Sequence, residues 1–263
     1  MNRLKIKQAI RGWTGVFLAA TRHPIALKAE ERFPGLFRWI VLRFDPHHFR
    51  GLPFTVLCMG VLLNMLVLSE LAEEVIEISQ LRKLDLAIVD FFHQYRSEQF
   101  AGWIFAFTRL CSSPAVLAIA GMLTFFAVWR RRFHALVAIL AALAASSITA
   151  FLGKIYYRIP RPVNEAWYEE FSWSFPSGHA TVAVAYYGVL FYLLVHHVHS
   201  QSLKRLIRSL AIGFILLMGF SRIYLCVHYL SDVLAGYAIG LLWFLFSVSL
   251  LSWLDFRKDI RGV

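Results

Sequence analysis

Long stretches without Lys, Arg, Asp or Glu constrain this chain more than any other feature. Five of them meet or approach the length of a membrane span: 52–69, 110–129, 133–152, 180–195 and 233–253. A helix rises about 1.5 Å per residue, so about 20 apolar residues cross a hydrocarbon core of about 30 Å. A sixth stretch, 206–221, contains Arg208 near its start, where a long side chain can reach the interface. The sequence therefore predicts an all-α bundle of six membrane-spanning helices.

The composition agrees with a membrane protein and excludes other classes. Hydrophobic residues make up 59% of the chain and charged residues only 16%, whereas soluble domains hold about 45–50% and about 25%. Too little polar surface remains to cover a water-soluble core. The formal charge of +11 fits basic residues that flank spans and face anionic lipid head groups. Because no basic patch accompanies a readable motif, no nucleic-acid partner is expected.

The distribution of Lys and Arg predicts the orientation of the helices. With six spans, one side receives residues 1–50, residues 130–132, the start of the fifth span and the C-terminal residues, which together hold 19 of the 27 basic residues. The positive-inside rule places this side, and with it both termini, in the cytoplasm. We expect residues 1–50 to form a basic segment at the membrane surface and residues 51–255 to form the six-helix domain. Residues 84–95, in the first outer loop, are predicted to form an amphipathic helix that covers the interface.

Charged residues on the poorly basic outer side gather at three junctions between spans. In chain order they are Lys154, Arg158, Arg161, His179, Arg222, His228 and Asp232. Ionisable groups at a membrane edge are costly unless they are paired or functional. The junctions therefore predict a functional site on the outer face. Arg158 is expected to be an interfacial anchor outside that site.

Part of this cluster is suited to binding an anion. Lys154 offers a point charge, and Arg161 and Arg222 offer planar forks that fit phosphate oxygens. Ser177 and Gly178 stand at the start of a helix, where unpaired backbone N–H groups and the helix dipole favour an anion. Lys154 or Arg161 taken alone would more often be an ordinary helix-end anchor. Together they predict a phosphate-binding cradle.

Histidines supply the reactive groups. His228 and Asp232 are four residues apart, which on a helix places both on one face and lets the carboxylate hold one ring nitrogen. The other nitrogen is then available as a nucleophile. His179, from a different helix, is predicted to protonate the leaving oxygen. The histidines within 196–199 lack a carboxylate partner and are predicted to form a polar helix end, so no metal site is expected.

Three segments carry a resemblance to a known family. They read KIYYRIPRP at 154–162, PSGH at 176–179 and SRIYLCVHYLSD at 221–232. In order and spacing they resemble the three-part signature of the type-2 phosphatidic acid phosphatase superfamily, with no departure at a motif position. Residues 1–50 have no counterpart in this resemblance.

The resemblance implies a metal-independent lipid phosphatase that forms a covalent phosphohistidine and needs no cofactor. It assigns His228 as the nucleophile and Asp232 as the residue that orients it. His179 would act as the acid for the leaving group and then as the base for water. The residues that would hold the phosphoryl oxygens are Lys154, Arg161, Ser177, Gly178 and Arg222.

The expected substrate is a membrane lipid phosphate or diphosphate, and the site is expected to face the periplasm from a bacterial inner membrane. Undecaprenyl diphosphate, phosphatidylglycerol phosphate, phosphatidic acid and lipid A phosphates are all candidates. A phosphotransferase that passes the phosphoryl group to a second lipid would use the same residues. A transporter or silent scaffold is disfavoured, because the charges collect at one face. The ring-rich stretch 167–175, with Glu169 and Glu170, fits either an aromatic belt or a lip that admits a head group.

Overall fold

The computed structural model describes residues 24–35, 37, 80–162 and 166–261, together with six single positions between 58 and 70. The chain separates into two compact units, Met1–Leu62 and Leu63–Val263, which are described separately. The first unit contains helix α2 (Pro24–Arg32). Most of the predicted first span, 52–69, lies outside the described residues. That span, the total of six and the orientation of the termini therefore remain predictions.

The described residues of the second unit form helices joined by turns and one long loop, without a strand. This confirms the all-α class. The elements are α5 (Gln80–Tyr95), α6 (Glu98–Thr108), the 3₁₀ turn η1 (Arg109–Cys111), α7 (Ser113–Trp129), α8 (Phe133–Tyr157), α9 (Gly178–Val182), the π-helical turn η2 (Ala183–Tyr187), α10 (Gly188–His197), α11 (Gln201–Tyr224) and α12 (Leu230–Arg261).

Four of the predicted spans are helices long and apolar enough to cross a membrane. They are α8, the continuous segment Gly178–His197, α11, and Leu230–Asp255 within α12. The predicted span 110–129 differs, because α7 begins only at Ser113 and forms with Glu98–Cys111 a pair bent by 43°. Pro114 lies in the first turn of α7, a position where its missing N–H has no helical partner. Where the sequence predicted one straight second span, the structure therefore has a bent pair of helices.

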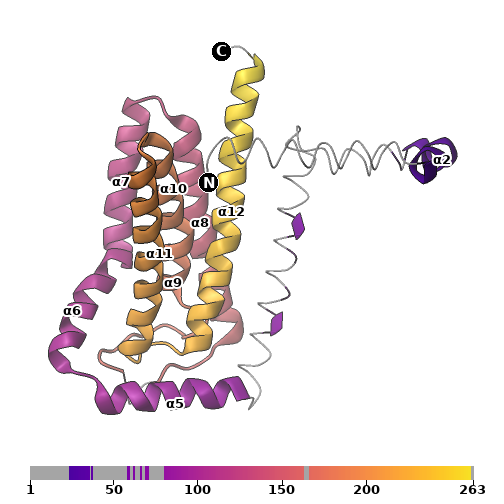
Figure 1. Cartoon of the computed structure of the whole chain (residues 1–263). Helices are drawn as coiled ribbons and strands as arrows, with labels where there is room; N and C mark the ends of the chain where they lie inside the picture. The colour runs from indigo at the N-terminus through magenta and orange to yellow at the C-terminus, as the bar shows by residue number, and fades with distance from the viewer. Residues whose placement is uncertain are drawn as a thin grey trace. The chain divides into compact units, whose positions relative to one another are not determined.

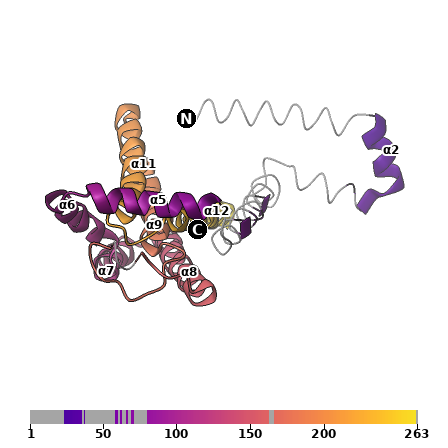
Figure 2. The ribbon, with the colours of Figure 1, turned by 90° about the horizontal axis from the view of Figure 1, so that it is seen from below.

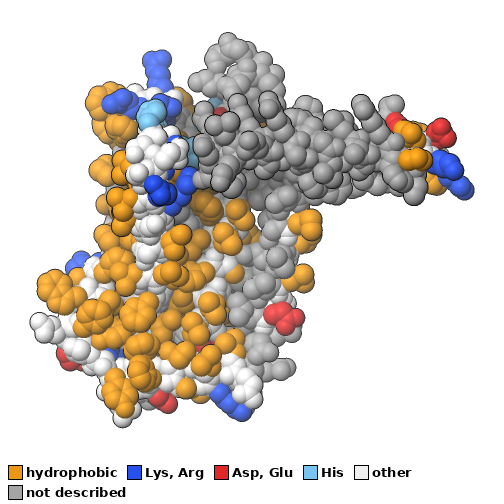
Figure 3. All heavy atoms as spheres, in the orientation of Figure 1, with side chains coloured by type: hydrophobic (Ala, Val, Ile, Leu, Met, Phe, Trp, Pro, Cys, Tyr) orange, Lys and Arg blue, Asp and Glu red, His pale blue; other side chains and the backbone are white. Residues whose placement is uncertain are grey.

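Helices α7, α8, α10, α11 and α12 lie side by side, and α5 lies across one end of them (Figure 1). Figure 2, seen from that end, shows α5 crossing the ends of α11 and α12. The amphipathic helix predicted around residues 84–95 is therefore present as α5. Apolar side chains cover the visible face of the helices (Figure 3), and those of Leu117, Phe125 and Trp129 are each at least 65% exposed. Such a surface is suited to contact with lipid tails.

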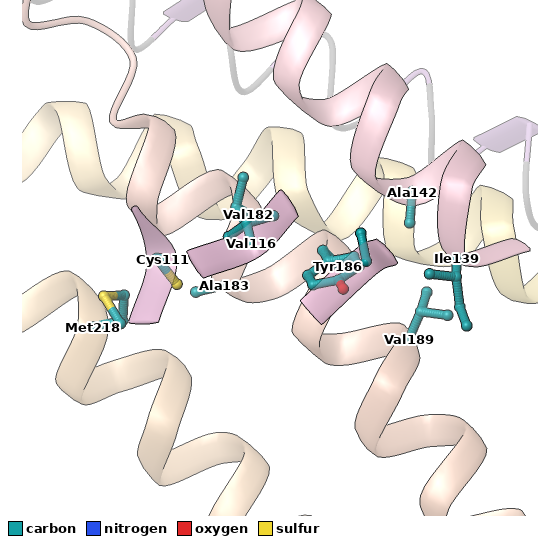
Figure 4. Close-up of a cluster of buried hydrophobic side chains, with 10 residues drawn as sticks. Cys111, Val116, Ile139, Ala142, Val182, Ala183, Tyr186, Val189 and Met218 are labelled. Atoms are coloured by element: carbon teal, nitrogen blue, oxygen red, sulfur yellow. The ribbon is translucent and has the colours of Figure 1, made fainter. Parts of the chain in front are cut away.

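The core lies where α7, α8, the α9–α10 segment and α11 meet (Figure 4). Ala142, Ala183 and Val189 are fully buried there, and Tyr186 and Met218 fill the space between the helices. The π-helical turn η2 lies within this core. Turns of this kind are rare and often accompany functional sites. This packing supports the span whose first residues carry the PSGH motif.

Two glycines let α12 approach α9 closely. A Cβ at Gly236 would lie 2.6 Å from the carbonyl oxygen of Ser177, and one at Gly240 would lie 2.7 Å from that of Thr181. Small residues four positions apart commonly allow membrane helices to pack at short distance. The backbone N–H of Ser177 also donates to the carbonyl oxygen of Asp232 at 3.0 Å. The start of α9 is thereby held against the start of α12, which brings two of the motifs together.

Candidate active site

His228 lies in the turn between α11 and α12 and is 1% exposed. Its Nδ1 is 3.1 Å from Oδ2 of Asp232, and its Nε2 is 3.0 Å from Nη1 of Arg161. A guanidinium only donates, so we assign Nε2 as the acceptor and the ring proton to Nδ1, which donates to the carboxylate. The predicted contact with Asp232 is present, but not on one helix face, because His228 precedes Leu230, the first residue of α12.

The surroundings of His228 favour its neutral form. Burial lowers the pKa of His228 well below its ordinary value, and the positive charges of Arg161, Arg222 and Lys154 lower it further. The imidazole therefore stays neutral at pH 7, as a nucleophile must. His179 lies in the first turn of α9 and is half-buried.

Asp232 is completely buried in the first turn of α12. Its Oδ2 accepts hydrogen bonds from the backbone N–H of Tyr229 at 2.9 Å, from the Ser174 hydroxyl and from His228 Nδ1. The bond from Tyr229 is one half of a capping box, in which the third residue of a helix reaches back to the N-cap N–H. One carboxylate oxygen therefore both caps α12 and orients the imidazole.

Backbone carbonyls and a hydroxyl position two cations of the site. Arg161 Nε donates to the Ser172 carbonyl oxygen at 2.6 Å, its Nη2 to the Ser172 hydroxyl at 2.9 Å, and its Nη1 to the Val227 carbonyl oxygen at 2.5 Å. Lys154 Nζ donates to the carbonyl oxygen of Trp173 in the same loop. Side chains held in this way are preorganised, which is what electrostatic stabilisation of a reacting group requires.

Arg222 is completely buried at the end of α11. Its Nε and Nη1, and the hydroxyl of Ser177, have no hydrogen-bond partner in the described part of the chain. Buried donors are costly unless an acceptor completes them. Gly178 begins α9, and a Cβ there would meet no atom within 4 Å, so the helix start is open to a ligand. These groups form a cradle suited to the oxygens of a phosphoryl group.

Two further residues belong to this cluster although no motif pointed to them. Oε2 of Glu170 lies 3.1 Å from Nη1 of Arg161 and 2.7 Å from Nη2 of Arg222. The hydroxyl of Ser174 contacts Asp232 and lies 3.3 Å from Nδ1 of His228. The one sequence signal for Glu170 was its position, as a carboxylate in the loop between two cationic motifs. A single loop serine such as Ser174 carries no signal of its own.

Arg158 lies outside the cluster. It ends α8 in a left-handed conformation, with φ at 51°. Its side chain donates from Nε to the carbonyl oxygen of Ile155 at 3.1 Å. The exposed position agrees with the predicted anchor at the helix end.

Two solved crystal structures share the fold of this chain. The crystal structure of a transmembrane PAP2-type phosphatidylglycerolphosphate phosphatase from Bacillus subtilis aligns with 74% of this chain and 96% of its own, with a TM-score of 0.66 and 26% identity. The crystal structure of Aquifex aeolicus LpxE covers 63% of this chain and 94% of its own, with a TM-score of 0.50 and 22% identity. The second likeness is one of fold alone.

Comparison of sequences points to one family. Phosphatidylglycerophosphatase B of Bacillus subtilis (strain 168) is 45% identical over 76 residues, which are 28% of this chain and 37% of that protein. This chain thus matches little more than a third of that curated relative. Residues 135–255 match the model of the PAP2 superfamily, and this range contains all three motifs and the cluster around His228. Residues 135–255 therefore form a domain of the PAP2 superfamily.

Proposed function

We propose that this protein is an integral-membrane lipid phosphatase that hydrolyses a lipid phosphate or diphosphate through a phosphohistidine. The observation that carries the proposal is the neutral imidazole of His228, held between Asp232 and Arg161 beside the unpartnered donors of Arg222 and Ser177. A nucleophile, its orienting carboxylate and an oxyanion cradle are thus buried in one cluster. Phosphoryl transfer needs mainly positioning and charge stabilisation, and these groups are suited to both.

The proposed reaction has two steps. Nε2 of His228 attacks phosphorus while the bond from phosphorus to the leaving oxygen breaks, and His179 donates a proton to that oxygen. Asp232 stabilises the positive imidazole through Nδ1–H. His179 then takes a proton from water, the water oxygen attacks phosphorus, and inorganic phosphate leaves with His228 neutral again. The cations of the cradle neutralise the phosphoryl oxygens, so no step requires a metal ion.

Arg161 has to change partners during this reaction. In the structure its Nη1 faces Nε2 of His228, the atom whose lone pair must attack phosphorus. A phosphoryl group held by Arg222 offers Nη1 an oxygen acceptor in place of the ring nitrogen. Substrate binding would thereby expose the nucleophile.

The surroundings of the cluster support a lipid as the substrate. An apolar cavity of about 390 Å³ has Leu152 and Tyr156 of α8 in its lining, together with Phe175 and Pro176 at the start of the PSGH motif. Phe171, in the same loop, is 96% exposed, which suits a ring that meets the bilayer. Lipid tails can remain beside these groups while the head group reaches the cradle. Phosphatidylglycerol phosphate, undecaprenyl diphosphate, phosphatidic acid and lipid A phosphates all fit this description.

We further propose that the site faces the periplasm of a bacterial inner membrane and that both termini lie in the cytoplasm. Two described basic groups support this orientation, since Arg132 precedes α8 and Lys204 lies in the first turn of α11. Both are at the helix ends opposite the cluster. Excess Lys and Arg is typical of the cytoplasmic side.

The test is phosphate release from a panel of the four lipid classes by purified protein in detergent. We expect release from at least one lipid, inhibition by vanadate, no effect of a chelator and no activity in His228→Ala. Mass analysis of the products distinguishes a phosphotransferase, which would yield a phosphorylated acceptor lipid in place of free phosphate. A chain that releases phosphate from none of these lipids, or strictly requires magnesium, would contradict the proposal. A transporter would keep its flux in His228→Ala.

A further inference from the structure

A second pocket lies at the end of the second unit opposite the candidate active site. Its volume is about 760 Å³, and it lies where α8 begins, α10 ends and the last turns of α12 pass. The 25 residues of α8 span about 37 Å at about 1.5 Å per residue. The pocket and the cradle are therefore near opposite surfaces of a bilayer. The chemistry proposed for His228 makes no use of this pocket.

Cationic side chains dominate the polar lining of the pocket. Arg131 and Arg132, from the turn between α7 and α8, both line it. Asp255 is the single carboxylate among its described lining residues, and it lies 2.8 Å from Nδ1 of His134. Lys, Arg and His side chains gather at this end of the second unit (Figure 3). The lining therefore favours an anion over a cation.

Two histidines at the end of α10 add further polar groups to the lining. Nδ1 of His196 and of His197 each lie 2.8 Å from a backbone carbonyl oxygen one turn earlier, on Tyr192 and Leu193. A carbonyl only accepts, so Nδ1 carries the proton in both rings and Nε2 is left to interact with a ligand. Nε2 of each ring can accept a hydrogen bond from a hydroxyl group of a lipid head group.

Arg131 holds a backbone conformation that normally selects glycine. Its φ is 52°, its N–H donates to the carbonyl oxygen of Val128 at 3.0 Å, and that of Arg132 donates to the carbonyl oxygen of Ala127 at 2.7 Å. These two bonds form a Schellman motif, in which the left-handed residue is usually glycine. A left-handed backbone conformation costs free energy at any residue other than glycine. Residues other than glycine that hold such a conformation cluster at sites that clamp ligands.

Apolar side chains form the remaining walls of the pocket. Such a lining favours a lipid over a soluble anion. Phe133, Leu251 and Leu254 line the pocket beside the cations. A phospholipid offers a phosphate for the cations and chains for these walls, and basic pockets between membrane helices bind acidic head groups. The N-terminal segment is a poor occupant, because residues 1–50 hold ten Lys and Arg residues against three Asp and Glu.

We propose that this pocket binds the phosphate head group of an anionic phospholipid, from the leaflet opposite the one that the candidate active site faces. Arg131 and Arg132 hold the phosphate, the ring nitrogens of His196 and His197 complete the surroundings of the head group, and the chains lie against Phe133. The site is separate from the phosphatase chemistry and does not depend on it.

The test uses the full chain, reconstituted with a mixture of phosphatidylglycerol and phosphatidylcholine and then released into mild detergent. Native mass spectrometry counts the lipids that stay bound. We expect the wild type to retain phosphatidylglycerol in preference to phosphatidylcholine. Arg131→Gly is expected to weaken this retention about fivefold, the effect of one cation near an anionic lipid. Its melting temperature should not fall, because glycine suits the left-handed turn.

The matched control is Arg130→Gln, which removes one charge from the same turn. The guanidinium of Arg130 lies 5.2 Å from the ring centroid of Phe126 and 5.8 Å from that of Trp129, and Arg130 does not line the pocket. This variant should retain phosphatidylglycerol as the wild type does. Arg222→Gln should also retain it, which separates this pocket from the cradle. Asp255→Asn should increase retention, because it removes the carboxylate.

Three results would overturn the proposal. The first is equal retention of phosphatidylglycerol and phosphatidylcholine by the wild type. The second is equal loss of lipid in Arg131→Gly and Arg130→Gln. The third is replacement of the bound lipid by inorganic phosphate at millimolar concentration, which would identify the ligand as a soluble anion.

Discussion

Glu170 and Arg222 form an ion pair in which Oε2 lies 2.7 Å from Nη2, and the same oxygen lies 3.1 Å from Nη1 of Arg161. One carboxylate oxygen therefore bridges two arginines that the motifs assign to the phosphoryl group. Its side chain is 27% exposed and comes from a loop, so it can move aside without disturbing a helix. In the proposed enzyme, substrate binding has to displace this internal anion.

Replacement of Glu170 by Gln tests this competition. The amide keeps the shape but removes the charge that competes with phosphate. We expect KM and the inhibition constant of vanadate to fall about threefold to tenfold, the effect of one ordinary hydrogen bond of about 0.5–1.5 kcal/mol. The melting temperature should also fall, because two buried arginines lose their counter-charge, and vanadate should restore it. Steady-state kinetics and thermal unfolding in detergent measure both effects.

Glu169→Gln is the matched control for that variant. It removes the same charge from the neighbouring position, and no ion pair joins Glu169 to either arginine in the described residues. Its KM should stay at the wild-type value. A rise in KM for Glu170→Gln would show that the carboxylate helps to bind substrate.

Ser174 supports catalysis through Asp232. Ser174→Ala removes a hydrogen bond to a buried carboxylate, which is worth about 1.5–3 kcal/mol, and so loosens the residue that orients His228. We expect kcat to fall about tenfold to a hundredfold with little change in KM. Ser174→Thr keeps the hydroxyl and should recover much of the rate. Equal damage by both substitutions would point to a packing role for Ser174.

The depressed pKa of His228 predicts how stability depends on pH. In the unfolded chain this histidine takes up a proton near its ordinary pKa of about 6.5, whereas the folded chain does so only well below that pH. The stability from the neutral, buried ring is therefore complete above about pH 6.5 and is lost as pH falls toward the folded pKa, by up to about 1.4 kcal/mol per pH unit.

The measurement is the melting temperature from pH 7.5 downwards in wild type and in His228→Gln, with the slope expected to decrease in the variant. The slope of the variant is subtracted from that of the wild type, because other groups also change stability with pH. Burial raises the pKa of Asp85, for example, and a raised carboxyl pKa adds stability as pH falls through it. His93→Gln, at an exposed position of α5, should keep the wild-type slope. Equal slopes in His228→Gln and wild type would contradict the assignment.

Close packing of α12 on α9 predicts a large effect of a small substitution. Gly236→Ala places a methyl group 2.6 Å from the carbonyl oxygen of Ser177, so the helices must separate at the point that joins two motifs. Overpacking of this kind is destabilising by about 1–3 kcal/mol, and we expect activity to fall with stability. Gly121→Ala on α7 meets no atom within 4 Å and should be neutral or stabilising. Similar melting temperatures for the two variants would argue against the close contact.

Hydropathy was sufficient to predict four of the spans. The stretches 133–152, 206–221 and 233–253 lie inside α8, α11 and α12, each of which extends several residues further. The helices are longer because hydropathy marks only the hydrocarbon core, whereas backbone hydrogen bonding continues through the interface. The break at Ser112 was missed because an uncharged run contains no signal for a bend within it.

The identities of the motif residues were also readable, but their partners were not. Arg161 contacts His228 across 67 positions, and Arg222 contacts Glu170 across 52. Spacing within one or two turns predicts which residues share a helix end. It does not predict the path of the loop after α8, which carries Glu170 and Ser174 into the cluster.

Residue types and short-range spacing were thus enough to establish a helical membrane protein with clustered cations and two histidines, because burial in lipid and helix periodicity act locally. Only the tertiary structure revealed three further features: Glu170 bridges the two arginines, Ser174 supports Asp232, and a second pocket lies at Arg131. Each depends on contacts between segments distant in sequence, whose approach is set by close helix packing such as that at Gly236.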